Sequence, residues 1–206
     1  MLDPDSLTLI AITDGVERST EDIVQRALAC VRGGATMVQL RLKDADARTQ
    51  VEVARALVAA LPAHVPLIMN DRADLAIASG ASGVHVGSED LPATAVRRIL
   101  GPDRILGVSV GNDAEALQAR VADYVGIGPV YATASKGDAG SAIGVGELER
   151  LATLCARPAV GVGGIDASNA AAAISAGARG VAVIRALFGA SDPETAARSL
   201  RSAIGK

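Results

Sequence analysis

The chain has 206 residues, a length typical of one domain, and half of its residues are apolar. Its 20 basic and 23 acidic residues give a formal net charge of −3, which argues against a nucleic-acid partner. No apolar run approaches the roughly 18 residues of a membrane span, and the first residues lack the basic start of a signal peptide. We therefore expect one cytoplasmic domain over residues 1–206, with no membrane or nucleic-acid partner.

The composition also bounds the core and the redox chemistry. Two Tyr, one Phe and no Trp leave the core to be built from aliphatic side chains. The two cysteines, Cys30 and Cys155, belong to no CxxC pair and have no histidine cluster beside them. We expect both to be buried, reduced thiols.

Short runs of Val, Ile and Leu alternate with longer Ala-rich segments, the pattern of buried parallel strands joined by crossover helices. In chain order, the expected strands are 7–13, 37–40, 67–69, 83–86, 105–110, 124–127, 159–162 and 180–184. The expected helices are 20–32, 46–61, 72–79, 92–100, 113–122, 146–156, 168–176 and 193–204. Expected N-caps are Thr20, Ser168 and Asp192, and expected C-terminal stops are Gly33, Gly80, Gly101 and Gly177.

Eight β/α units of about 26 residues each predict an α/β fold, a single-domain (β/α)8 TIM barrel. The alternative is a doubly wound open sheet, which would normally carry a phosphate-binding glycine motif after its first strand. Here that turn reads Thr13-Asp14-Gly15, so the barrel is favoured. The connection over residues 131–144, YATASKGDAGSAIG, is long and polar, which predicts a lid or a binding loop.

In such barrels the active site lies at the carboxyl ends of the strands. After the second strand, Gln39, Arg41 and Lys43 alternate along the chain and should face one side. Three hydrogen-bond donors on one face suit a polyanion. A polar layer of the barrel core, with surface charges beyond it, is the alternative.

The next three strands add carboxylates and a hydroxyl. Asp71, preceded by Asn70, follows the third strand, and Asp90 follows the fourth; together they could hold Mg²⁺ with substrate phosphates. Each carboxylate could instead cap the helix that follows it. His85 lies within the fourth strand and is expected to be a satisfied structural histidine. Ser109 stands at the rim with no histidine nearby to activate it, which favours positioning over nucleophilic attack.

The last three loops offer donors for a second anion. They supply Thr133, Ser135 and Lys136 in the long connection, Gly164 in GVGGI after the seventh strand, and Ile184 and Arg185 after the eighth. Loops seven and eight are the recurrent phosphate site of these barrels. The sequence thus predicts two anion sites facing each other across the barrel mouth, one with a metal and one without.

These motifs together resemble a known family. They are QLRLK at 39–43, ND at 70–71, GVHVGSED at 83–90, GVS at 107–109, DYVGIGPVYATASK at 123–136 and GVGGI at 161–165. In this order and spacing, from about residue 7 to 204, they resemble the thiamine-phosphate synthase family. The resemblance implies a transferase that joins hydroxymethylpyrimidine diphosphate to a thiazole phosphate, forming thiamine phosphate and diphosphate.

The resemblance also implies roles for individual residues. The residues expected to contact the pyrimidine diphosphate are Gln39, Arg41, Lys43, Asn70, Ser109 and Lys136, of which Arg41, Ser109 and Lys136 are the expected catalytic residues. Asp71 and Asp90 are expected to bind one Mg²⁺ ion per subunit. The thiazole phosphate would be bordered by Thr133, Ser135, Gly164, Ile184 and Arg185.

Four positions depart from the family pattern. The family usually has a glutamate at Leu42, a histidine at Gly111, a threonine at Ser135 and often a serine at Arg185. Ser135 keeps the hydroxyl. Arg185 replaces a neutral donor with a cation.

No general base or nucleophile stands out, so rate acceleration is expected from stabilising the leaving diphosphate through Mg²⁺, Arg41, Lys43 and Lys136. This favours a dissociative path, in which the thiazole nitrogen captures a pyrimidine cation. Closure of the loop around Lys136 would exclude water.

Three other functions stay open. A thiazole tautomerase of the same family needs no diphosphate site, which leaves Asp71 and Asp90 unexplained. A non-catalytic barrel that binds phosphometabolites would show no Mg²⁺-dependent turnover. Another phosphate-binding barrel enzyme, such as one acting on a sugar phosphate, fits loops seven and eight but not the paired carboxylates. The sequence leaves open a homo-oligomer and the choice between a carboxylated and a non-carboxylated thiazole phosphate.

Overall fold

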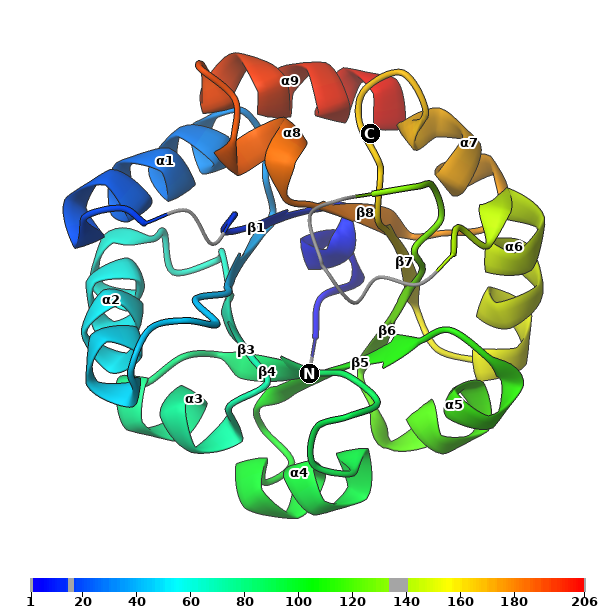
Figure 1. Ribbon diagram of the computed structural model, residues 1–206, viewed down its shortest axis with the longest axis horizontal. Helices are drawn as coiled ribbons and strands as arrows, with labels where there is room; N and C mark the ends of the chain where they lie inside the picture. The colour runs from blue at the N-terminus through cyan, green and yellow to red at the C-terminus, as the bar shows by residue number, and fades with distance from the viewer. Residues whose placement is uncertain (1, 15–16, 134–140, 206) are drawn as a thin grey trace.

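The computed structural model describes residues 2–14, 17–133 and 141–205, and within them the chain forms the expected barrel. Eight parallel strands close into one sheet in the order β1 to β8, with β8 paired to β1. Figure 1 looks along the barrel and shows the helices as an outer ring around the strands. The alternative of an open, doubly wound sheet is therefore excluded.

The strands are short and regular. They are β1 Leu9–Ile12, β2 Met37–Leu40, β3 Leu67–Asn70, β4 Gly83–Val86, β5 Ile105–Val110, β6 Tyr124–Ile127, β7 Ala159–Val162 and β8 Gly180–Val183. The α-helices are α1 Thr20–Arg32, α2 Ala47–Ala60, α3 Ala73–Ser79, α4 Ala93–Leu100, α5 Asp113–Gln118, α6 Gly144–Cys155, α7 Ala170–Ser175, α8 Arg185–Phe188 and α9 Pro193–Ile204. Two 3₁₀ turns, η1 Pro4–Leu7 and η2 Ala119–Val121, complete the described elements. None of the helices in the described part of the chain is long and apolar enough to cross a membrane.

Several element ends differ from the sequence prediction. The first strand is shorter than expected because Pro4 starts η1, whose N-cap Asp3 accepts from the N–H of Asp5 at 3.0 Å. Helix α1 is capped by Ser19, not Thr20, and the N-cap of α7 is Asn169, not Ser168. The expected cap Asp192 is confirmed, since its side chain accepts from the N–H of Thr195.

The core has two layers, as the continuous apolar runs of the strands require. One layer fills the barrel interior, where Leu7, Ile10, Met37, Ile68 and Val160 are almost fully buried. The other lies between the sheet and the ring of helices and contains both cysteines. The expectation of buried thiols is confirmed, and both cysteines are free.

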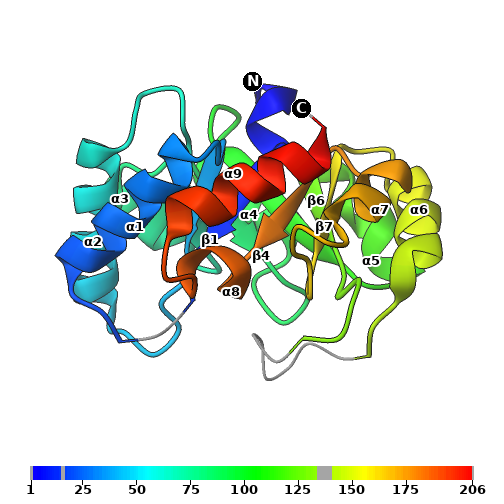
Figure 2. The same cartoon turned by 90° about the horizontal axis from the view of Figure 1, so that it is seen from above.

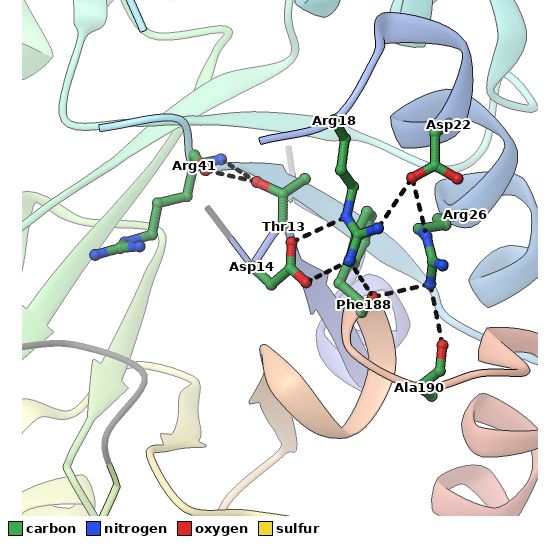
Figure 3. A network of polar contacts seen from close by, with 8 residues as sticks. All are labelled: Thr13, Asp14, Arg18, Asp22, Arg26, Arg41, Phe188 and Ala190. Carbon is green, nitrogen blue, oxygen red and sulfur yellow. Dashed lines mark hydrogen bonds and ion pairs between the residues drawn. The ribbon is translucent and has the colours of Figure 1, made fainter. Parts of the chain in front are cut away.

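A polar network holds the first helix against the end of α8, where the barrel closes (Figure 3). Arg18 donates to Asp14 at 2.8 Å and to Asp22 at 3.0 Å. Arg26 donates at 3.0 Å to the carbonyl oxygens of both Phe188 and Ala190. Cationic donors at a helix C-terminus satisfy carbonyls that have no partner within the helix. The network therefore fixes α8 to the first β/α unit.

Candidate active site

A cavity of about 990 Å³ opens at the carboxyl ends of the strands. The structure brings every predicted site residue that it describes to this cavity. They are Gln39, Arg41, Lys43, Asn70, Asp71, Asp90, Ser109, Thr133, Gly164, Ile184 and Arg185. The two remaining predicted residues, Ser135 and Lys136, lie outside the described residues, so the expected lid around Lys136 stays a prediction.

The first group of donors comes from β2 and the loop after it. The side-chain amide of Gln39 donates to Asn70 Oδ1 at 2.9 Å, which joins β2 to β3. Arg41 follows the end of β2 and is only 9% exposed. Its backbone is held by Thr13, whose hydroxyl accepts from the Arg41 N–H at 2.8 Å and donates to the Arg41 carbonyl at 2.7 Å (Figure 3).

The guanidinium of Arg41 is incompletely satisfied by the protein. Its Nε is buried and has no hydrogen-bond partner among the described residues. A buried donor without a partner costs about 1–3 kcal/mol, more when the group is charged. Arg41 also lines the cavity, where the positive charge of its guanidinium would attract an anionic ligand.

The two predicted metal ligands stand on adjacent loops of the cavity wall. Asp71 adopts a left-handed backbone with φ 64°, and its N–H donates to the carbonyl of His85 at 2.8 Å. A non-glycine residue in this region carries strain that is often found at functional sites. Asp90 Oδ2 accepts from the N–H of Gly87 at 2.7 Å and so closes its own loop.

Neither carboxylate serves as the N-cap of the following helix, because the N-cap positions of α3 and α4 are Arg72 and Pro92. The described residues contain no group of three or more His, Cys, Asp or Glu side chains placed to hold a metal. A site of two carboxylates completed by ligand oxygens and water still suits Mg²⁺, which usually keeps several waters. Asp71 and Asp90 fit that kind of site.

The opposite wall is made of backbone from the loop after β7. Gly164 has φ 65°, and a Cβ atom there would lie 2.7 Å from the carbonyl oxygen of Ala132. The carbonyl of Gly164 accepts from the side-chain amide of Asn169 at 2.9 Å, which fixes the loop. Arg185 is exposed at the start of α8 and also lines the cavity.

The floor of the cavity corrects one sequence expectation. Ser109 was expected to have no histidine nearby, but its Oγ lies 3.0 Å from His85 Nε2. The other ring nitrogen, Nδ1, lies 3.0 Å from the Tyr124 hydroxyl. His85 is therefore a satisfied, buried histidine, as predicted, yet it also lines the cavity with Tyr124. The link between Ser109 and His85 was missed because they lie on different strands, 24 residues apart.

The structure also locates two positions that were expected to depart from the family pattern, Gly111 and Leu42. Gly111 lines the cavity and donates its N–H to Glu115 Oε2 at 2.7 Å. Leu42 is partly buried against the layer of core between sheet and helices.

The fold and the cavity define a (β/α)8-barrel enzyme that acts on small molecules. A sequence model described as thiamine monophosphate synthase matches residues 9–187. The chain belongs to the thiamine monophosphate synthase family.

Individual relatives agree over nearly the full length. The thiamine-phosphate synthase of Xanthobacter autotrophicus is 47% identical, with 98% of this chain and 97% of that protein aligned. The thiamine-phosphate synthase of Moorella thermoacetica is 48% identical over 97% of this chain and 95% of its own. A solved structure of thiamine phosphate pyrophosphorylase from Pyrococcus furiosus superposes with a TM-score of 0.87 and 34% identity, covering 98% of this chain and 97% of that one.

Proposed function

We propose that this protein is a thiamine-phosphate synthase, a transferase that joins hydroxymethylpyrimidine diphosphate to thiazole phosphate and releases diphosphate. The observation that carries the proposal is that one cavity gathers cations, two carboxylates and a glycine-rich loop from different strands. Relatives that bear this name align with almost the whole chain. The two free thiols agree with a cytoplasmic location.

The pyrimidine diphosphate is assigned to the wall formed by β2, β3 and the loop after β2. Arg41 and Lys43 line the cavity and provide positive charge for the diphosphate. The Gln39–Asn70 hydrogen bond orients two amides beside it. The predicted contact from Lys136 would add a third cation.

Asp71 and Asp90 are the residues assigned to one Mg²⁺ ion. When bound, the ion would neutralise charge on the leaving diphosphate. The protein itself holds the two carboxylates on neighbouring loops. The one on Asp71 projects from a residue with a left-handed backbone.

The thiazole phosphate is assigned to the wall opposite, with Thr133, Ser135, Gly164, Ile184 and Arg185 around it. Backbone N–H groups of a glycine-rich loop can approach an anion closely. Two anions held on opposite walls place the electrophilic carbon and the thiazole nitrogen toward each other. This arrangement requires no general base, because bond breaking at the diphosphate would precede capture by the thiazole nitrogen.

The direct test is incubation of the purified protein with both substrates, with Mg²⁺ or with EDTA, while thiamine phosphate and diphosphate are followed. We expect Mg²⁺-dependent formation of both products in equal amounts. Product formation that is unaffected by EDTA would contradict the metal assignment. A folded protein that makes neither product would contradict the proposed activity and favour the tautomerase or the binding barrel.

A matched pair of variants tests the carboxylate assignment. Asp71→Asn should raise the Mg²⁺ concentration needed for half-maximal rate by roughly 10–100-fold, which corresponds to loss of one charge-assisted ligand worth about 1.5–3 kcal/mol. Asp44→Asn removes an exposed carboxylate that does not line the cavity and should leave the Mg²⁺ requirement unchanged. Equal effects of the two substitutions would refute a specific role for Asp71.

A further inference from the structure

Three side chains form a hydrogen-bonded chain from the barrel core to the cavity. The Tyr124 hydroxyl on β6 lies 3.0 Å from His85 Nδ1 on β4, and His85 Nε2 lies 3.0 Å from Ser109 Oγ on β5. Tyr124 is 1% exposed, His85 is 9% exposed and Ser109 is half-buried. The hydrogen-bonded chain therefore joins a tyrosine packed in the apolar cluster beneath the cavity to a more accessible serine hydroxyl.

Two glycines leave the room that this chain needs. In the strand register, Gly107 stands between His85 and Tyr124, paired with both. A Cβ atom at Gly107 would overlap His85 Nδ1 and the Tyr124 ring, and one at Gly126 would lie 3.0 Å from His85 Cε1. The imidazole is thus held between close neighbours, with its centroid 5.5 Å from that of the Tyr124 ring.

The surroundings of Tyr124 decide where the protons lie. The side chain belongs to the apolar cluster that fills the barrel, and burial, with the nearby Asp123 charge, raises the pKa of Tyr124 above its ordinary value. The hydroxyl therefore keeps its proton. In the described part of the chain, the hydrogen-bond partner found for this hydroxyl is His85 Nδ1.

A buried O–H without an acceptor costs free energy, so the Tyr124 hydroxyl must donate to His85 Nδ1. An Nδ1 that accepts carries no proton, and in the neutral ring the proton is then on Nε2. Nε2–H donates to Ser109 Oγ. The serine oxygen is thereby used as an acceptor, and its own proton is available to a group in the cavity.

We propose that Tyr124 and His85 are positioning residues that fix Ser109 as a hydrogen-bond donor toward the cavity, where it binds an acceptor atom of the pyrimidine diphosphate. The identity of the substrate rests on the proposed function, whereas the positions of the protons on Tyr124, His85 and Ser109 do not. One consequence is that His85 cannot take the proton of Ser109, because the facing nitrogen is already protonated. Ser109 therefore acts as a donor and not as a nucleophile.

The tautomer of His85 can be measured without any turnover. Long-range ¹H–¹⁵N spectra of protein labelled at histidine distinguish a proton on Nε2 from one on Nδ1. The exposed His64 is the other histidine, and the variant His64→Gln assigns the signals. We expect His85 to carry its proton on Nε2 in the native protein. A proton on Nδ1 would overturn the proposal, whether or not the protein is a synthase.

A double-mutant cycle tests the link to substrate. Tyr124→Phe and Ser109→Ala should each lower kcat/KM by roughly five- to tenfold, as expected for one hydrogen bond. The double variant should be no worse than Ser109→Ala alone, because Tyr124 acts through Ser109. Multiplied losses in the double variant would refute this route of action.

A buried hydroxyl far from the cavity provides the matched control. Ser79→Ala on α3 removes a hydroxyl that donates to the carbonyl of Leu75 at 2.7 Å. This substitution should lower stability but leave kcat/KM unchanged. If it lowered kcat/KM as much as Tyr124→Phe, the effect of Tyr124→Phe would be one of general stability and the proposal would fail. Should Tyr124→Phe not fold, the spectrum of the native protein still decides the proton arrangement.

Discussion

Replacing Thr13 by valine should both destabilise the barrel and loosen Arg41. Thr13 is 2% exposed, and its hydroxyl makes two hydrogen bonds to the backbone of Arg41, accepting at 2.8 Å and donating at 2.7 Å. Valine has nearly the same shape but neither donates nor accepts. The Arg41 N–H and carbonyl would therefore lose their partner without any change in packing volume.

The size of the effect follows from these two backbone groups. A buried polar group left without a partner costs about 1–3 kcal/mol, so two groups set an upper limit near 6 kcal/mol. Arg41 lines the cavity, and water entering there can satisfy part of the loss. We expect a decrease of about 2–3 kcal/mol in the free energy of unfolding, which lowers Tm by roughly 4–12 °C in a chain of this length.

Urea denaturation with a serine variant as control isolates the hydroxyl. Thr13→Ser keeps both hydrogen bonds and loses one methyl group, worth about 1 kcal/mol. In the kinetic assay, Thr13→Val should also raise KM for the pyrimidine diphosphate, because the Arg41 guanidinium would be less well placed. If the valine and serine variants unfolded at the same urea concentration, the two hydrogen bonds would not stabilise this junction, and the reasoning would be refuted.

Two further predictions concern stability and thiol chemistry. Arg97 donates to carbonyls around the ends of α4 and η2 and to Asp123 at 2.7 Å, so Arg97→Ala should cost about 2 kcal/mol in urea denaturation. Its exposed neighbour gives the control, since Arg98→Ala should change stability by less than about 0.5 kcal/mol. Burial raises the pKa of the Cys30 thiol to about 12 and also raises the pKa of Cys155. At pH 8 a thiol reagent should therefore label neither cysteine until the protein is unfolded, and rapid labelling of native protein would contradict their burial.

Much of the barrel could be predicted because each strand is buried on both faces. Such strands read as unbroken apolar runs, and the expected bounds of β5 and β6 coincide with those observed. For the same reason the first strand was predicted to begin at Leu7. Leu7 is buried, but it belongs to the 3₁₀ turn η1 and packs in the barrel interior. The four residues of α8 were missed because one turn is too short to show helical periodicity.

The candidate site was also predictable only in part. Its residues could be predicted because they are polar and follow strands, and parallel strands of a barrel all end at the same mouth. The left-handed backbone of Asp71 could not, because aspartate only occasionally adopts it. The link from His85 to Ser109 depends on register between strands, which is fixed by tertiary pairing. The glycines at 107 and 126 were the available signal, because both stand beside the imidazole.

The two ends of the described chain lie on one side of the barrel (Figure 2). The turn η1 precedes β1, and α9 runs back toward the amino ends of the strands, so both ends are opposite the cavity. A reporter, a surface anchor or a second enzyme could be joined genetically at either end without obstructing substrate entry. The barrel is thus suited to immobilisation in a defined orientation, with its open mouth directed away from the support.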